Sequence, residues 1–149
     1  MLGKDYEGQD CALARALEVV GERWTLLIVR DAFFGVRRFN DFQAHLDIPK
    51  AVLAGRHIYE LTAAGRDLWP ALYALLMWGG RHRAPNSRLY QHAACGNTLD
   101  QAGWCEKCHL TPALEDVQTA PRPGHRPLRN DPVSVVMRVP RRLLDPIET

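Results

Sequence analysis

The chain has 149 residues, of which 46% are hydrophobic and 24% charged, and its formal net charge at pH 7 is +2. This composition is ordinary for soluble protein and leaves room for one main domain with an appendage. The small net charge neither requires nor excludes a nucleic-acid partner, because a whole-chain sum can hide a local basic face.

The first ten residues are polar, carry acidic side chains and lack the apolar core of a signal peptide. We therefore expect residues 1–10 to be a mobile arm and the protein to be cytoplasmic. Cys11 follows at the start of a helix, where exposed N–H groups would stabilise a thiolate. It is a candidate redox sensor, although a small packing residue is the favoured interpretation.

Apolar residues at helical spacing then predict three helices with short breaks. Gly21 interrupts the first, the second is apolar on nearly every side until Gly35, and Asn40 is the candidate cap of the third. Ile48-Pro49 opens a fourth segment, with proline suited to a first helical turn. Two short helices after a buried one form the layout of a helix-turn-helix. The expected helices span residues 13–20, 22–34 and 39–46.

Several of these runs closely resemble the HxlR-type branch of the MarR-like winged helix-turn-helix transcriptional regulators. The resemblance covers about residues 10–82 and is carried by residues 11–31, 35–42, 48–49 and 59–70. It implies a mainly α (α+β) fold and a homodimer that binds a pseudo-palindromic operator in double-stranded DNA. It also implies regulation by a small-molecule effector or by thiol oxidation.

Polar side chains near the expected helix-turn-helix are candidates for contacts with phosphate oxygens. The alternative is a solvated turn in which an arginine pairs with Asp41, and the family pattern favours DNA. These candidates are Arg37, Arg38, Asn40 and Gln43.

The fourth segment departs from the family pattern because a winged helix needs a longer recognition helix and two wing strands before Ile58. Pro49 to Ala54 would span only about 9 Å as a helix. Either the recognition helix and wing are truncated, or residues between positions 54 and 58 are missing from the sequence. We favour the second explanation. Removal of this part would uncover the apolar face of the second helix. In the favoured case Lys50 begins the recognition helix, and Arg56 and His57 remain from the wing.

Thr62 is a plausible N-cap for a further helix that bends or restarts at Trp69-Pro70. Residues 68–78 carry no charge and are too few to cross a bilayer, so protein must cover them. We expect a long C-terminal dimerisation helix, with complete burial inside one subunit as the alternative. The expected dimer interface contains Trp69, Leu72, Tyr73, Leu76 and Trp78.

The second feature with a chemical role is the spacing His92-x2-Cys95-x9-Cys105-x2-Cys108. Two such ligand pairs form the two knuckles of a zinc ribbon, and four ligands would saturate a structural zinc ion. His109 is an alternative fourth ligand. Free thiols or a redox-active cysteine pair are the competing interpretations. The ribbon-like module would span residues 84–118, after a domain at 11–83.

Residues 119–149 are rich in proline and arginine, which predicts a mostly extended or mobile tail. A valine-rich run predicts a strand at 133–139. The chain offers no nucleophile with an adjacent base in sequence and no phosphate-binding glycine loop, so we do not expect an enzyme. A dimeric adaptor that uses the ribbon and tail to bind other proteins is the alternative to a DNA-binding regulator.

Overall fold

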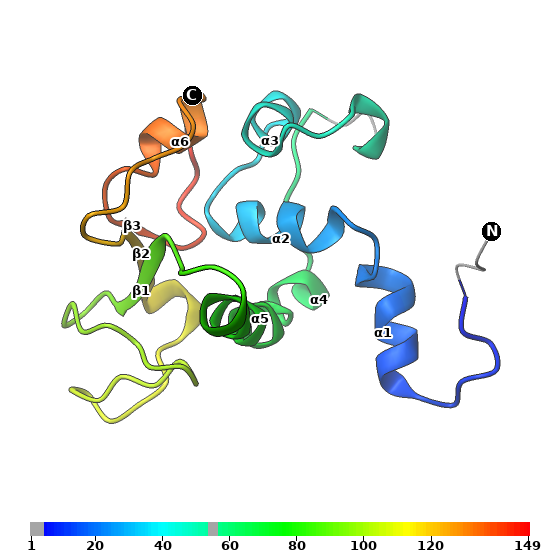
Figure 1. The fold of residues 1–149 in the computed structure, drawn as a ribbon, viewed down its shortest axis with the longest axis horizontal. Helices are drawn as coiled ribbons and strands as arrows, with labels where there is room; N and C mark the ends of the chain where they lie inside the picture. The colour runs from blue at the N-terminus through cyan, green and yellow to red at the C-terminus, as the bar shows by residue number, and fades with distance from the viewer. Residues whose placement is uncertain (1–4, 54–56) are drawn as a thin grey trace.

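The computed structural model describes residues 5–53 and 57–149, and its fold is mixed α+β. Helix α2 (Thr25–Phe33) lies at the centre, with α3 (Phe39–Leu46) on one side and α5 (Trp69–His82) on the other (Figure 1). A small sheet and α6 (Pro132–Val136) occupy one end of the molecule. Helix α1 (Ala12–Val20) occupies the opposite end.

The N-terminal helices begin and end close to their predicted positions. Helix α1 ends at Gly21, and the second helix is shorter than expected because residues 22–24 precede it. Gly35 follows α2 with a φ of +97°, and a Cβ there would lie 1.8 Å from the carbonyl oxygen of Asp145. Only glycine fits both the backbone conformation and this close approach.

The third helix has a different cap from the predicted one. Arg38 occupies the N-cap position, its side chain makes no cap hydrogen bond, and Asn40 lies inside the first turn. The next segment forms only a short 3-10 helix, η1 (Lys50–Val52), which begins after Pro49. In the described part of the expected wing, Ile58 forms an isolated antiparallel bridge with Arg38.

The two helices after this segment follow the predicted pattern. Thr62 caps α4 (Ala63–Arg66), because its hydroxyl accepts a hydrogen bond of 3.0 Å from the backbone N–H of Gly65. Helix α5 restarts at Trp69 with Pro70 in its first turn. No helix in the described part of the chain is long and apolar enough to cross a membrane.

Three antiparallel strands follow, in the order β1 (Arg88–His92), β2 (Val117–Pro121) and β3 (Arg141–Arg142). The 3-10 helix η2 (Leu114–Asp116) leads directly into β2. Strand β1 pairs with β2 in a register that places His92 opposite Val117. The sheet therefore joins the expected module at 84–118 to residues of the expected tail.

The tail is packed against the rest of the molecule, which corrects the prediction of an extended or mobile segment. Val133, Met137, Leu143 and Ile147 are buried in the same core as Phe42. The predicted strand at 133–139 is also wrong, since α6 occupies most of that run. Burial of two residues four positions apart suits a helix face, and a strand would have buried alternate residues.

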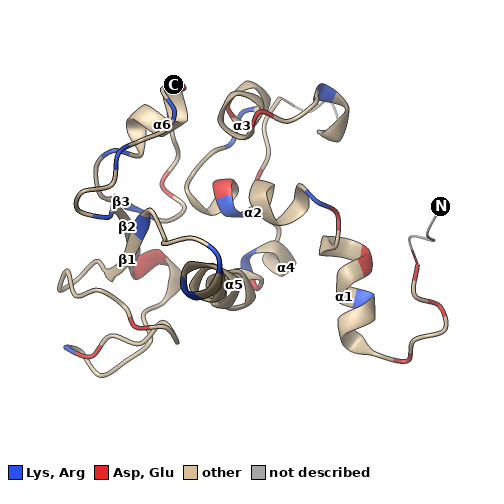
Figure 2. Cartoon of the chain, viewed as in Figure 1, with Lys and Arg blue, Asp and Glu red and all other residues tan. Residues whose placement is uncertain are grey.

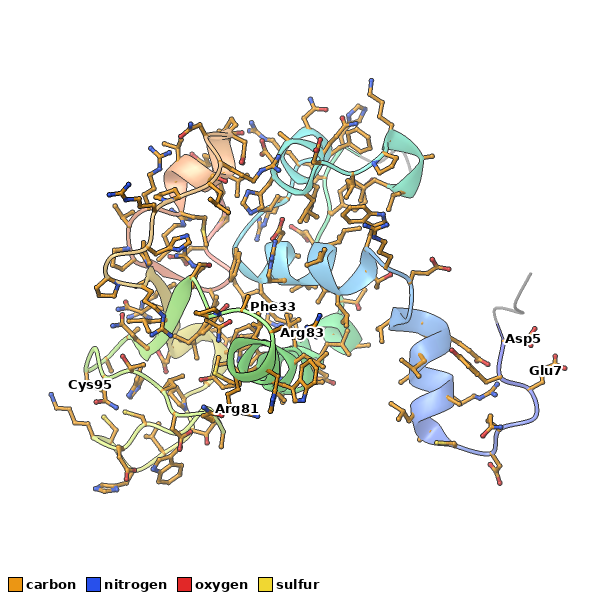
Figure 3. The ribbon with its side chains drawn as sticks, viewed as in Figure 1. Asp5, Glu7, Phe33, Arg81, Arg83 and Cys95 are labelled. Atoms are coloured by element: carbon orange, nitrogen blue, oxygen red, sulfur yellow. The ribbon has the colours of Figure 1, made fainter. Side chains whose placement is uncertain are left out.

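An aromatic cluster joins the helices to the sheet. Trp69 lies 5.1 Å from Phe33 and 5.7 Å from Tyr90 between ring centroids, and the ring of Tyr73 is 5.6 Å from that of Tyr90. Figure 3 shows Phe33 between α2 and α5, toward the sheet. Such edge-on pairs each stabilise a core by about 0.5–1.5 kcal/mol beyond burial.

Candidate nucleic-acid interface and metal centre

The residues predicted to contact DNA lie at several places in the helix-turn-helix. Arg38, Asn40 and His57 line one open hollow together with Thr149, at the N-terminal end of α3. Lys50 is exposed on η1, and Gln43 is half-buried on α3. Arg56 lies outside the described residues.

Both arginines of this region contact other parts of the chain. The guanidinium of Arg37 lies 3.6 Å from a carboxylate oxygen of Glu60, whereas the alternative interpretation of this turn paired an arginine with Asp41. Arg38 donates a hydrogen bond of 2.9 Å to the backbone oxygen of Thr149. These contacts are exposed, and a phosphate group could compete for such arginines at small cost.

The predicted metal ligands come together in one cluster. The ligand atoms of His92, Cys95, Cys105 and Cys108 all lie within 4.8 Å of one another. The Sγ of Cys95 is 3.5 Å from both the Nδ1 of His92 and the Sγ of Cys105. Two sulfurs bound at about 2.3 Å to a tetrahedral ion would lie about 3.8 Å apart, so this donor set could hold a metal.

Each pair of ligands sits on a tight turn, as the knuckle pattern predicts. The N–H of Gly96 donates to the carbonyl of His92 at 2.7 Å, and Gly96 has a φ of +72°. On the second turn, the N–H of His109 donates to the carbonyl of Cys105 at 2.8 Å. His109 itself is exposed and does not belong to the cluster.

The thiols of the cluster have unequal proton affinities. Cys105 is fully buried, which opposes ionisation, but a backbone N–H at Cys108 and the side chains of His92 and Cys95 lower its pKa to about 6. The pKa of Cys108 is raised to about 11, chiefly by the hydrogen bond that its side chain shares with Cys95. A bound metal ion would displace the protons of these thiols, because thiolates are the ligand form.

Cys11 stands apart from this chemistry. It is exposed as the N-cap residue of α1, and its side chain makes no cap hydrogen bond. The exposed position contradicts the favoured interpretation of a packing residue, and the redox role stays a prediction.

The expected dimer interface is only partly exposed. Leu72 and Tyr73 are each 5% exposed, and the hydroxyl of Tyr73 donates to the carbonyl of Asp100 at 2.6 Å. The loop between the metal ligands therefore covers part of the surface that we expected a second subunit to cover. Trp69 and Leu76 pack against the same core, while Trp78 is 52% exposed.

The structure also brings together a buried polar cluster that the sequence did not indicate. Asp31 on α2 is fully buried, with its Oδ2 3.8 Å from the Nε2 of His45, whose Nδ1 lies 3.1 Å from both Asp131 and Ser134. Ser134 Oγ donates to Asp131 at 2.5 Å, so the hydroxyl joins the helix cap to the polar cluster. The N-cap signal of Asp131-Pro132 could have located one part of this cluster.

Comparison with known proteins assigns the chain to a family. A model described as "HxlR-like helix-turn-helix" matches residues 19–57, which include α2, α3 and η1. The uncharacterized HTH-type transcriptional regulator Rv3095 of Mycobacterium tuberculosis is 37% identical over 150 residues, which cover 84% of this chain and 93% of the relative. Regulator Mb3122 of Mycobacterium bovis gives the same identity of 37% and the same coverage. The chain belongs to the HxlR-like helix-turn-helix family of transcriptional regulators.

A solved structure supports the same assignment. The crystal structure of PA1607, a candidate transcription factor, has 33% sequence identity and a TM-score of 0.55, and the match covers 64% of this chain and 83% of that one. This similarity extends to the helix-turn-helix fold and to the class of protein.

Proposed function

We propose that this protein is a transcriptional regulator that binds double-stranded DNA as a homodimer through its helix-turn-helix. One observation carries the proposal: the segment matched by the family model exposes Arg38 and Asn40 at the N-terminal end of α3, and Lys50 on η1. Amide and cationic side chains at this position suit phosphate contacts that fix the register of the protein on DNA. Gln43 and His57 add further polar groups, and Arg56, which lies outside the described residues, is expected from the sequence alone to contact DNA.

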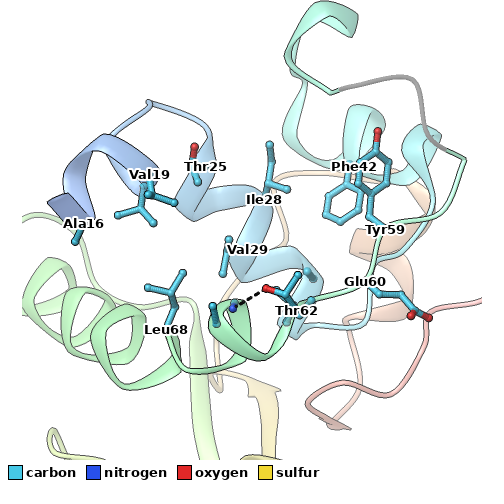
Figure 4. Close-up of a pocket in the computed structure, with 15 residues that line it drawn as sticks. Ala16, Val19, Thr25, Ile28, Val29, Phe42, Tyr59, Glu60, Thr62 and Leu68 are labelled. Atoms are coloured by element: carbon cyan, nitrogen blue, oxygen red, sulfur yellow. Dashed lines mark hydrogen bonds between the residues drawn. The ribbon is translucent and has the colours of Figure 1, made fainter. Parts of the chain in front are cut away.

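The homodimer is supported by apolar surface that one subunit leaves uncovered. A pocket of about 450 Å³ lies between α1, α2 and α4, and its lining is almost entirely apolar (Figure 4). Leu13 and Val19 on α1 are 67% and 73% exposed, and Leu75 on α5 is 51% exposed. Apolar areas of this extent on a small protein mark interaction surfaces.

We further propose that the His92/Cys cluster binds one structural zinc ion. Three sulfurs and one imidazole nitrogen are a preferred zinc donor set, and four protein ligands leave no open position for a catalytic water. The ion would fix the two turns that support Leu99 and the carbonyl of Asp100, which contacts α5.

The proposed DNA binding is tested by fluorescence anisotropy of duplexes of about 30 base pairs, long enough for two half-sites one helical turn apart. We expect log affinity to fall linearly with log salt, and Lys50→Gln to reduce the slope by about 0.9 for one lost phosphate contact. Lys107→Gln, another exposed lysine in the loop between metal ligands, is the matched control and should leave the slope unchanged.

The dimeric adaptor remains the second candidate because η1 contains only three residues. Moreover, the alignment with the relative Rv3095 runs over 150 positions but includes only 84% of this 149-residue chain. The relative therefore carries residues that have no counterpart here. Absence of DNA binding at low salt, or binding that ignores salt, would reject the regulator and favour the adaptor.

A further inference from the structure

We propose that the basic pocket, the cavity lined by Arg30, Arg88, Arg129 and Arg138 between the helix-turn-helix and the C-terminal part, binds a small organic anion with an apolar body. The pocket has a volume of about 580 Å³. This volume is in the range that accommodates a small-molecule ligand. The inference rests on the proposed regulator function, since the anion would be the effector of that regulator.

The walls of the basic pocket carry an excess of positive charge. Basic residues lie on the segments before and after α6 and beside the sheet (Figure 2). Two acidic side chains offset part of this charge: Asp31 pairs with Arg30 at 2.7 Å, and Asp131 lies 3.5 Å from Arg129. Four guanidiniums therefore face two carboxylates, and the pocket as described attracts an anion.

Arg88 supplies the second and independent observation. Its Nε donates to Thr119 at 2.8 Å and its Nη1 to the carbonyl of Met137 at 2.9 Å. Its Nη2 is buried without a hydrogen-bond partner among the described residues. A buried donor left unpaired is unfavourable, and a carboxylate that accepts from it would remove that cost.

The guanidiniums of Arg88 and Arg30 also lie beside the same aromatic ring. Both lie over the ring of Phe34, at 5.7 Å and 5.6 Å from its centroid. Burial and the nearby charge of Arg30 lower the pKa of Arg88. Two like charges held near one aromatic ring are stabilised by an anion that binds close to both of them.

The remaining lining indicates which anions fit. Phe34, Pro85, Pro121 and Met137 give the pocket apolar walls beside its cationic groups. An inorganic ion would leave these walls in contact with water, whereas an aromatic or aliphatic carboxylate would cover them. We therefore assign the pocket to hydrophobic carboxylates.

The position of the pocket gives such a ligand a regulatory route. Arg30 and His45 belong to α2 and α3 of the helix-turn-helix, while Arg88, Arg138 and Ser134 belong to the C-terminal part. A carboxylate bound across this contact would favour the arrangement of the two parts that it binds more tightly. It would change the affinity for DNA by at most the ratio of its own affinities for the two arrangements.

The test is equilibrium dialysis of the full chain, without DNA, against benzoate and its uncharged analogue benzamide. We expect saturable benzoate binding at one site, at least tenfold tighter than benzamide, because one charge-assisted hydrogen bond is worth about 1.4 kcal/mol or more. Arg138→Gln should weaken benzoate binding about tenfold without unfolding the protein, since this side chain is exposed. Arg88→Gln should weaken it at least as much. Arg81→Gln, in the last turn of α5 (Figure 3), is the control and should have no effect.

Equal affinity for benzoate and benzamide, no saturable binding, or unchanged binding by both pocket variants would overturn the assignment. Displacement of benzoate by random duplex DNA, with an equal loss of DNA affinity in Arg138→Gln, would show that these arginines serve the DNA interface and would also overturn it. Because dialysis is done without DNA, its failure is distinguishable from failure of the salt titration that tests the regulator.

Discussion

At the scale of single residues, Asp131 connects α6 with α3. It caps α6 by accepting from the N–H of Ser134 at 3.0 Å, and it accepts the Ser134 hydroxyl and contacts His45 on α3. Burial opposes its charge, but the hydrogen bonds from Ser134 and the proximity of His45 lower the pKa of Asp131 to about 2. The ionised carboxylate therefore stabilises the packing of α6 against α3.

Replacement of Asp131 by alanine is expected to lower the free energy of unfolding at pH 7 by about 1–2 kcal/mol, the usual effect of losing a helix N-cap. A lowered folded-state pKa stabilises the fold above the unfolded value of 3.8, and this stabilisation is lost as the pH falls through about 2. The difference between Asp131→Ala and the native chain should therefore shrink from about pH 4 downward. Urea denaturation at a series of pH values measures it.

Asp5→Ala is the control for this measurement, because Asp5 is exposed in the N-terminal segment. It should leave stability unchanged at every pH. A difference for Asp131→Ala that stayed constant between about pH 5 and pH 2 would contradict the assigned role of the charge.

At the scale of elements, the helices that the sequence predicted correctly are those whose start and stop residues agree with their hydrophobic pattern. The break at Gly21, the cap at Thr62 and the restart at Pro70 are all observed. Helix α6 was missed because the valines at 133, 135 and 136 in the helix, and Val139 after it, favour a strand by propensity. The Asp131-Pro132 start signal and the tertiary packing against α3 decide for a helix instead.

The metal cluster shows which part of a site local spacing can specify. Knuckle spacing identified all four residues that the structure brings together, since each pair lies on one turn. The polar cluster of Asp31, His45 and Ser134 and the basic pocket depend on contacts between segments about 90 positions apart. No local pattern encodes such contacts, so they could not be predicted.

Measurement of the zinc content tests whether the cluster of His92 and three cysteines binds a metal ion. We expect one zinc ion per chain by atomic spectrometry of protein purified without chelator, and a large loss in Cys105→Ser, because Cys105 is a buried member of the cluster. Cys11→Ser, at an exposed cysteine outside the cluster, should retain the metal. The pair His92→Ala and His109→Ala identifies the fourth ligand, and only the first should lose zinc. Full zinc content in Cys105→Ser would reject the site.

At the scale of the whole molecule, the C-terminal part changes what α5 can offer a partner. The loop near Asp100 and Tyr90 of the sheet contact Tyr73, and Leu72 is buried as well, so a second subunit meets only the remaining face of this helix. That face includes Leu75 and Trp78, and a groove beside it is lined by Leu26 and Leu27 of α2. The uncovered apolar faces of α1 and α5 together are the surface that we expect the homodimer to bury.

Native mass spectrometry of the full chain tests this surface. We expect a species of twice 16.9 kDa for the native protein. The double substitution Leu75→Arg and Trp78→Arg should give monomers at micromolar concentration, because two charges buried in an apolar interface without partners are strongly unfavourable. Val139→Arg, at a residue 58% exposed on the C-terminal part, is the control and should remain dimeric.

The same samples connect assembly with DNA binding. A homodimer that reads two half-sites should lose most of its affinity for a long duplex when it becomes monomeric, because the second half-site contact is then no longer intramolecular. Loss of affinity in the double variant, with its folded circular dichroism retained, would place the dimer in the DNA-binding mechanism. A double variant that stays dimeric would instead assign the interface to other residues, and an unchanged affinity in a monomer would mean that one helix-turn-helix is sufficient.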